Sequence, residues 1–443
     1  MILGERDTIV ALASGALPSA IAVVRVSGSR CAELLRAFTL DLPKPRNLVF
    51  RKIVSPDTGD LIDEGMVAYM PGPESFTGED CAEFHLHGSV AVVDRFIWQA
   101  SAFDGVRLAT AGEFSRRAFE SGKLDLTQVQ GLADLILSET ENQRIQSLSR
   151  MRGQLGEKVS AWRSRIIALM ALVEAQLDFS DESDVELLDW NTFCCKLSRL
   201  RKEVQDALNG YERGRIVREG FRIGLGGPPN VGKSSLLNRL ADSDLAIVTS
   251  EAGTTRDVRE VCVSIGGQLV LLYDGAGLRE TEDAIEYEGV QRAKAMLENA
   301  DLVLWLTSPD TQSDPDVPAG FNEVIRLNNK MDLGECGSGD LSISCKTGAG
   351  IDGLTALLAE KAQARGGSEG SLICHLRDKE CLSAAERDLM QLEAMARAES
   401  REQSLELIAE CLQRTGHQMQ RLLGLVDTEQ VLDRLFSGFC IGK

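Results

Sequence analysis

The feature that most constrains the fold is the segment of residues 227–234 (GPPNVGKS), which matches the pattern GxxxxGK[ST]. A short apolar run over residues 221–225 precedes it, and a helix is expected over residues 235–241. Glycines let backbone N–H groups turn toward a phosphate, and the start of the helix adds partial positive charge. In this pattern the lysine reaches the β- and γ-phosphates and the serine hydroxyl binds magnesium. The segment therefore predicts an α/β domain that binds a nucleotide.

Three further segments later in the chain indicate which nucleotide is bound. Residues 274–277 (DGAG) match the pattern DxxG and come directly after a predicted strand. In P-loop GTPases the aspartate of this pattern lies near the bound magnesium ion. Residues 329–332 (NKMD) follow the predicted strand at 324–327, and residues 344–346 (SCK) follow the next one. The carboxylate of Asp332 can accept two hydrogen bonds from the N1–H and 2-amino groups of guanine, and adenine offers no such pair. These motifs together predict a GTP-binding and GTP-hydrolysing domain.

The segment of residues 253–257 (GTTRD) is the predicted switch region. Thr255 is the expected second magnesium ligand, while Asp274 would meet the metal through water. Arg256 is either an arginine finger supplied in cis or a surface residue beside the switch, and we favour the surface residue. Leu278 stands where Ras-like enzymes carry a water-orienting glutamine, so another group must orient the attacking water. Candidates lie in the acidic stretch 280–288.

The predicted site binds a nucleotide and Mg²⁺. The nucleotide-binding residues are Asn230, Val231, Gly232, Lys233, Ser234, Ser235, Thr249, Ser250, Glu251, Ala252, Gly253, Thr254, Thr255, Asp274, Gly275, Ala276, Gly277, Asn329, Lys330, Met331, Asp332, Ser344, Cys345 and Lys346. The Mg²⁺ ligands are Ser234 and Thr255. Lys233 is also assigned a catalytic role, because its charge faces the transferred phosphate.

Composition limits the class of protein. The 443 residues predict two to four domains, and no run of ~20 apolar residues is present to span a membrane. The first residues lack the pattern of a signal peptide, and eleven cysteines are too sparse for a disulfide scaffold, so we expect a cytoplasmic protein with reduced thiols. The formal charge of -19 counts against broad electrostatic binding of nucleic acid. Any contact with RNA must be local or shared with a partner.

The pattern along the chain predicts a multidomain fold with α/β and α parts. Residues 1–119 alternate short strands with helices and read as an α+β domain. Residues 120–217 and 372–443 are predicted to be helical, and residues 218–371 hold the nucleotide-binding α/β segment. A helical domain interrupted by an inserted α/β domain is the simplest architecture.

Several segments outside the nucleotide motifs carry a family resemblance. They are residues 7–11 (DTIVA), 24–28 (VRVSG), 73–80 (PESFTGED), 112–119 (GEFSRRAF), 122–126 (GKLDL) and 439–443 (FCIGK). With these segments the chain resembles the MnmE (TrmE) family of tRNA-modification GTPases over essentially its full length. The resemblance implies three domains: an N-terminal folate-binding and dimerisation domain, a discontinuous helical domain, and an inserted Ras-like GTPase domain.

The resemblance also implies a folate site. Arg25, Glu83, Lys123 and Lys443 would hold 5-formyl- or 5,10-methylene-tetrahydrofolate, since basic groups can pair with the glutamate carboxylates of the folate. The alternative for Arg25 and Glu83 is an ion pair between strands. His85 and His87 alternate along a predicted strand, and without a third ligand we favour structural roles over metal binding.

By the same resemblance, a potassium ion replaces the arginine finger. Asn230, Thr249, Glu251 and the adjacent Thr254 would surround it, Glu286 would orient the attacking water, and two GTPase domains of a homodimer would meet across their nucleotides. Cys440 is similar to the reactive cysteine of the family. The alternative for Cys440 is an unreactive thiol in the chain terminus.

The function implied by the resemblance is modification of carbon 5 of the wobble uridine in certain tRNAs. The chain would act with an FAD- and NADH-dependent partner of the MnmG (GidA) type, in a heterotetramer or larger assembly. The added group is carboxymethylaminomethyl or aminomethyl, with its one-carbon unit from tetrahydrofolate. Two alternatives stay open: a ribosome-assembly switch GTPase without covalent chemistry, and a folate-dependent one-carbon transferase merely regulated by GTP.

Overall fold

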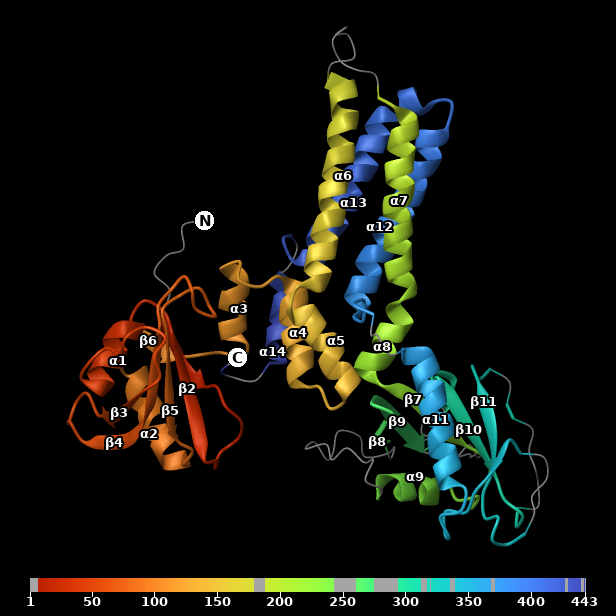
Figure 1. The fold of residues 1–443 in the computed structure, drawn as a ribbon, viewed down its shortest axis with the longest axis horizontal. Helices are drawn as coiled ribbons and strands as arrows, with labels where there is room; N and C mark the ends of the chain where they lie inside the picture. The colour runs from red at the N-terminus through yellow and green to blue at the C-terminus, as the bar shows by residue number, and fades with distance from the viewer. Residues whose placement is uncertain are drawn as a thin grey trace, which may run out of the picture. The chain divides into compact units, whose positions relative to one another are not determined.

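The computed structural model describes residues 7–178, 188–242, 260–274, 294–311, 317–318, 320–334, 339–367, 371–426, 429–439 and 442. The chain forms two compact units, Met1–Ala133 with Gln420–Lys443 and Asp134–Met419 (Figure 1). Both contain a sheet and helices, which confirms the predicted multidomain layout of α/β and α parts. Within the described segments, no helix is both long and apolar enough to cross a membrane.

The first unit is built on a sheet in the order β3-β4-β5-β2-β1-β6. Its strands are β1 (Thr8–Leu12), β2 (Ile21–Ser27), β3 (Val49–Val54), β4 (Leu61–Met70), β5 (Cys81–His87) and β6 (Val106–Leu108). Val24 pairs with Phe84, and both pack with helices α1 (Cys31–Thr39) and α2 (Val90–Ser101) in one buried cluster. Because side chains alternate along a strand, the neighbouring pair Arg25 and Glu83 points to the other face. The predicted α+β organisation is confirmed.

Helices cover part of that other face. Ile9 and Ala11 of β1 pack with Phe114 of α3 (Glu113–Glu120). Leu126 of α4 (Leu126–Ile136) packs with Phe436 of α14 (Glu429–Ser437) in a further buried cluster. The end of the chain is therefore part of the first unit.

The second unit holds a sheet in the order β12-β11-β10-β7-β9-β8. Its strands are β7 (Phe221–Gly226), β8 (Glu260–Ile265), β9 (Gln268–Asp274), β10 (Leu302–Thr307), β11 (Val324–Asn328) and β12 (Leu341–Ser342). All neighbouring strands are parallel except β8 and β9, which form an antiparallel hairpin around Gly266 and Gly267. Helices α9 (Lys233–Ala241) and α11 (Ile351–Gly366) share its core. The carboxyl ends of the parallel strands meet at one edge, which is where such sheets bind ligands.

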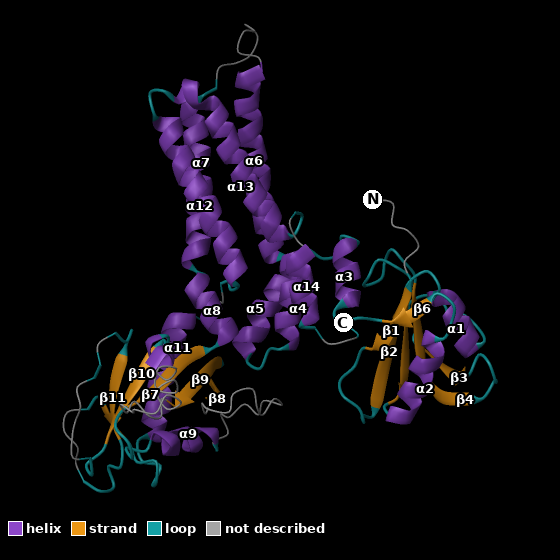
Figure 2. Cartoon of the chain, turned by 180° about the vertical axis from the view of Figure 1, so that it is seen from behind, coloured by secondary structure: helices purple, strands orange, loops and turns teal. Residues whose placement is uncertain are grey.

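Long helices make up the rest of the second unit, and α6, α7, α12 and α13 run alongside one another in both views (Figure 2). They are α6 (Gln154–Asp178), α7 (Trp190–Asn209), α12 (Leu376–Arg397) and α13 (Leu405–Leu423), with the shorter α5 (Glu141–Met151) and α8 (Tyr211–Glu219). The residues 120–217 that were predicted to be helical are divided into several helices, because a capping box at Thr140 starts α5 and Gly153 turns the chain at a φ of 86° before α6. A further division lies at Gly210, between α7 and α8.

Candidate nucleotide-binding site

The glycine-rich turn lies between β7 and α9, as predicted. Gly227 has a φ of 125°, and a Cβ there would lie 2.3 Å from the carbonyl oxygen of Leu306. Asn230 and Gly232 also have positive φ, of 64° and 98°. This backbone directs N–H groups to one side of the turn, next to the partial positive charge at the start of α9.

Lys233 is buried at the first turn of α9. Its Nζ donates to the carbonyl oxygens of Gly227 and Pro228, both at 2.8 Å. Burial lowers the pKa of Lys233, while the nearby Asp274 opposes that shift. The turn therefore holds a cation where the β- and γ-phosphates of a nucleotide would lie.

Ser234 and Asp274 form the metal side of the site. The Ser234 hydroxyl donates to Asp274 Oδ2 at 2.7 Å. Asp274 is buried, and its Oδ1 has no hydrogen-bond partner in the described part of the chain. A buried carboxylate oxygen without a donor is costly, and a hydrated cation would satisfy it. The pair therefore fits Mg²⁺.

A cavity of about 450 Å³ lies beside the turn. It is lined by Gly232, Ser235, Asn329, Lys330, Asp332, Leu333, Ser344, Cys345 and Lys346. The side chain of Asn329 donates to the Val231 carbonyl at 2.8 Å and accepts from the Cys345 N–H at 3.2 Å. Asn329 thus joins three loops that come from different parts of the chain.

The carboxylate of Asp332 lies at this cavity. Its Oδ1 accepts from the Ser344 hydroxyl at 2.6 Å, and this hydrogen bond lowers the pKa of Asp332. The group is an ionised acceptor at neutral pH, as recognition of guanine requires. Met331, which was predicted with these residues, is half exposed and does not line the cavity.

Other predicted residues lie outside the described part of the chain. They are Thr249, Ser250, Glu251, Ala252, Gly253, Thr254, Thr255, Gly275, Ala276, Gly277, Glu286, Cys440 and Lys443. The switch, the potassium ligands, the water-orienting glutamate and the terminal cysteine stay predictions.

In the first unit, Arg25 and Glu83 form an ion pair across β2 and β5, with Arg25 Nη2 at 2.9 Å from Glu83 Oε1. The guanidinium of Arg25 also lies over the ring of Phe76, at 5.5 Å from its centroid. Lys123 is exposed, and its Cε lies next to Gly78 of the same loop as Phe76. The ion pair between strands is therefore present in the structure. Arg25, Glu83 and Lys123, which were predicted to bind folate, all lie beside the loop that contains Phe76 and Gly78.

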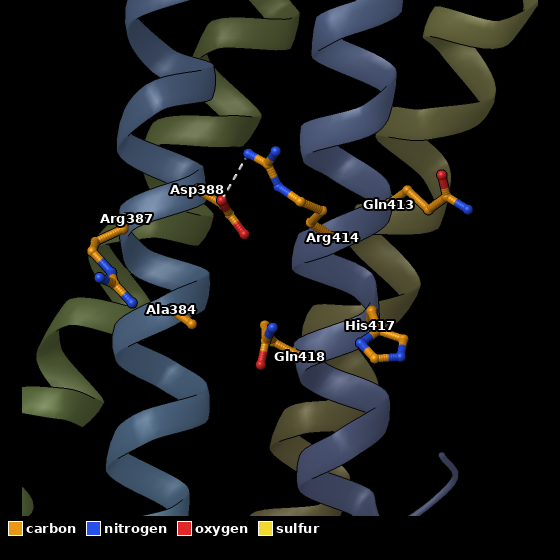
Figure 3. Close-up of a pocket in the computed structure, with 7 residues that line it drawn as sticks. All are labelled: Ala384, Arg387, Asp388, Gln413, Arg414, His417 and Gln418. Atoms are coloured by element: carbon orange, nitrogen blue, oxygen red, sulfur yellow. Dashed lines mark hydrogen bonds and ion pairs between the residues drawn. The ribbon is translucent and has the colours of Figure 1, made fainter. Parts of the chain in front are cut away.

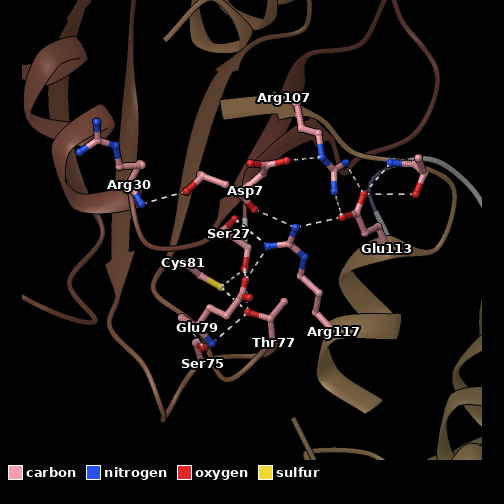
Figure 4. A network of polar contacts seen from close by, with 12 residues as sticks. Asp7, Ser27, Arg30, Ser75, Thr77, Glu79, Cys81, Arg107, Glu113 and Arg117 are labelled. Carbon is pink, nitrogen blue, oxygen red and sulfur yellow. Dashed lines mark hydrogen bonds and ion pairs between the residues drawn. The ribbon is translucent and has the colours of Figure 1, made fainter. Parts of the chain in front are cut away.

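A buried polar network supports this face, and sequence reasoning did not assign it a role (Figure 4). Arg117, almost fully buried, donates to Glu79 and Glu113, both at 2.9 Å, and to the Asp7 carbonyl. Glu113 also accepts from Arg107 at 2.6 Å. The segment of residues 112–119 (GEFSRRAF) contains both Glu113 and Arg117. Nothing in its spacing shows that Arg117 also contacts Glu79 and Asp7, which lie in two other loops.

Two other polar clusters do not point to a ligand. Asp134, Cys374 and His375 offer ligand atoms within 4.8 Å of one another, but Arg218 Nε lies 3.2 Å from Asp134 and burial raises the pKa of the Cys374 thiol to about 12. A guanidinium and a protonated thiol disfavour a metal ion there. His87 Nδ1 lies 2.8 Å from Asp63 Oδ1, and a structural role for His87 stays a prediction.

A hollow of about 520 Å³ between α12 and α13 is shown in Figure 3. In it Arg414 pairs with Asp388 at 3.0 Å. The side chains drawn mix opposite charges with amides and include no catalytic set.

A mostly parallel sheet whose carboxyl edge carries a lysine-ended glycine turn and a carboxylate-lined base cavity defines a P-loop guanine-nucleotide-binding protein. Residues 8–123 match the family described as GTP-binding protein TrmE N-terminus, and residues 126–440 match the MnmE helical domain. The chain belongs to the MnmE (TrmE) family of tRNA modification GTPases.

Relatives of similar length support this membership. The tRNA modification GTPase MnmE of Rhodopseudomonas palustris is 47% identical over 445 residues, and that of Azorhizobium caulinodans is 44% identical over 439, each match covering 99% of both chains. Among solved structures, Aquifex aeolicus Era bound to GDP and AlF₄⁻ is 22% identical, with a TM-score of 0.28 over 46% of this chain and 88% of that chain. The assignment rests on the sequence matches.

Proposed function

We propose that this chain binds and hydrolyses GTP and uses the reaction in the modification of the wobble uridine of certain tRNAs. The observation that carries the proposal is the base cavity, in which Asn329 connects the guanine-reading loop to the phosphate turn. Binding of base and phosphate would then be coupled through one side chain. The family membership supports the tRNA step.

The site residues suggest how hydrolysis proceeds. Lys233 and the N–H groups of the turn would neutralise charge on the phosphates, and Ser234 with Thr255 would hold Mg²⁺. Mg²⁺ supplies a positive charge that stabilises the leaving group. Asp274 would accept hydrogen bonds from the water bound to that ion. Glu286 would orient the attacking water in place of the glutamine that is absent at Leu278.

We further propose the domain boundaries 1–119, 120–217, 218–371 and 372–443, with the Ras-like GTPase domain inserted into the helical domain. The chain would work in the cytoplasm as a homodimer with a flavin-containing partner of the MnmG type. The chain carries a formal charge of -19, so that partner would provide most of the contact with tRNA.

The folate site is the second part of the proposal. Arg25, Glu83, Lys123 and Lys443 would bind a formyl- or methylene-tetrahydrofolate, and Cys440 would take part in the transfer. The support is the placement of Arg25, Glu83 and Lys123 beside one loop. An ion pair that is about a quarter exposed can exchange its partner for a folate carboxylate at little cost.

Mass analysis of tRNA from a strain that lacks this gene tests the proposal. We expect the wobble uridine to lose its carbon-5 group, and the wild-type gene, but not a Lys233→Met variant, to restore it. Normal wobble uridine together with accumulated ribosomal precursors would instead indicate a ribosome-assembly GTPase.

A further inference from the structure

Lys330, one of the residues that line the base cavity, makes an ion pair that the nucleotide motifs do not explain. Its Nζ lies 2.7 Å from Oδ2 of Asp310. Lys330 has a positive φ of 60°, and its side chain is only 27% exposed. Lys330 therefore has a constrained backbone conformation, and its ammonium group contacts a carboxylate from another loop.

Asp310 is itself held in place. Its Oδ1 accepts from the Ser308 hydroxyl at 2.7 Å, and the Ser308 carbonyl accepts from the Thr311 N–H at 3.1 Å to close a turn. Both carboxylate oxygens thus have a partner. The hydrogen bond from Lys330, with help from Ser308, lowers the pKa of Asp310, so the carboxylate is ionised at neutral pH.

The sheet brings the two loops together. Strands β10 and β11 are parallel neighbours, and Thr307 pairs in register with Asn328. The Thr307 hydroxyl donates to the Asn328 side chain at 2.7 Å, and the Thr307 carbonyl accepts from the Asn329 N–H at 2.8 Å. The loops that carry Asp310 and Lys330 therefore leave the sheet from two strand ends that are bonded to each other.

We propose that Asp310 is a positioning residue for the guanine-nucleotide site. It holds the flexible side chain of Lys330 along the wall of the cavity before the nucleotide arrives, so that less side-chain freedom is lost on binding. This inference rests on the proposed function, because it assigns a role to Asp310 only if the cavity takes a guanine nucleotide.

The test is a double-mutant cycle on GDP affinity, measured by titration calorimetry with Mg²⁺ present. We expect Asp310→Asn to weaken GDP binding about threefold to fivefold, as for a half-exposed ion pair. Asp310→Glu, which keeps the carboxylate, should recover part of that loss. In a Lys330→Met background, Asp310→Asn should have no further effect.

Asp352→Asn is the matched control, because it removes the same charge from an exposed position in the first turn of α11. Additive losses in the cycle, or an Asp310→Asn variant with wild-type affinity, would overturn the inference alone. Wild-type protein that bound no GDP would overturn the proposed function as well.

Discussion

Asp332 is proposed to recognise the base through one ionised carboxylate that Ser344 already orients. A carboxylate accepts from both N1–H and the 2-amino group of guanine, whereas an amide presents a donor on one side. We expect Asp332→Asn to weaken GTP binding about 100-fold, since charge-assisted hydrogen bonds are lost. The same variant should gain affinity for xanthosine triphosphate, whose 2-oxo group accepts from the amide.

Competition binding with GTP and xanthosine triphosphate measures this change in nucleotide preference. Xanthosine triphosphate serves as the internal control, because a variant that is merely misfolded would lose affinity for both. Unchanged preference for GTP would mean that Asp332 does not read the base.

Glu113 gives the first unit a predicted dependence on pH. Burial alone would raise the pKa of Glu113, but hydrogen bonds from Arg107, the Thr110 N–H and Arg117 lower it from 4.5 to about 2. A lowered folded-state pKa stabilises the protein above the unfolded value, so this stability is present above pH ~4.5 and is lost as the pH falls toward ~2. The contribution at neutral pH is about 3 kcal/mol.

We therefore expect Glu113→Gln to lower the free energy of unfolding at pH 7 and to have little effect near pH 2.5. Urea unfolding across this pH range measures the difference. Glu120→Gln on the same helix is the control, because its ion pair with Arg116 is about one-third exposed and should contribute little. Equal losses at both pH values would contradict the assignment.

At the scale of elements, α5 is joined to α12 by an ion pair with no solvent exposure, between Arg150 and Asp378 at 2.7 Å. The same face of α5 binds the segment that enters α12, since Gln146 donates to the Ser371 carbonyl at 2.8 Å and Arg150 donates to the Leu372 carbonyl. Removing one partner would leave an uncompensated buried charge. We expect Arg150→Met to cost about 3–5 kcal/mol of stability.

Thermal or urea unfolding checks this value against Arg144→Met. Arg144 lies on the same helix, but its partner Glu141 and its own side chain are about half exposed. We expect Arg150→Met with Asp378→Leu to recover most of the loss, because the charge that remains is removed. If Arg150→Met lowered the free energy of unfolding no more than Arg144→Met, the buried ion pair would contribute no more than an exposed one.

At the scale of the whole molecule, hydrolysis is proposed to depend on a potassium ion held by Asn230 and the switch. Asn230 lies in the phosphate turn with a positive φ of 64°. We expect replacement of K⁺ by Na⁺ to lower the GTPase rate about tenfold or more, because the smaller Na⁺ would bind poorly to ligands spaced for K⁺ and the positive charge near the transferred phosphate would then be missing. Rates measured at constant ionic strength test this, with GDP affinity as the control. Equal rates in both salts would remove potassium from the mechanism.

Much of the fold and of the site could be predicted from sequence because it is local. The order of strand, glycine turn and helix around Lys233 depends on neighbouring residues, and it was predicted correctly. Element boundaries were harder: the break between α5 and α6 and that between α7 and α8 occur inside stretches whose apolar spacing stays helical. The spacing of apolar residues reports which side chains are buried. Because residues can stay buried through a turn between two helices, this spacing does not show where one helix ends and the next begins.

The sequence by itself determined the chemistry of the nucleotide site, because a glycine turn, a lysine and a following helix start act over a few bonds. Only the tertiary structure decided which distant groups meet. Asn329 reaches Val231, Asp310 reaches Lys330, and Arg150 reaches Asp378 because sheet register and helix packing bring them together. Such pairs are far apart along the chain, and no periodic pattern of side chains encodes them.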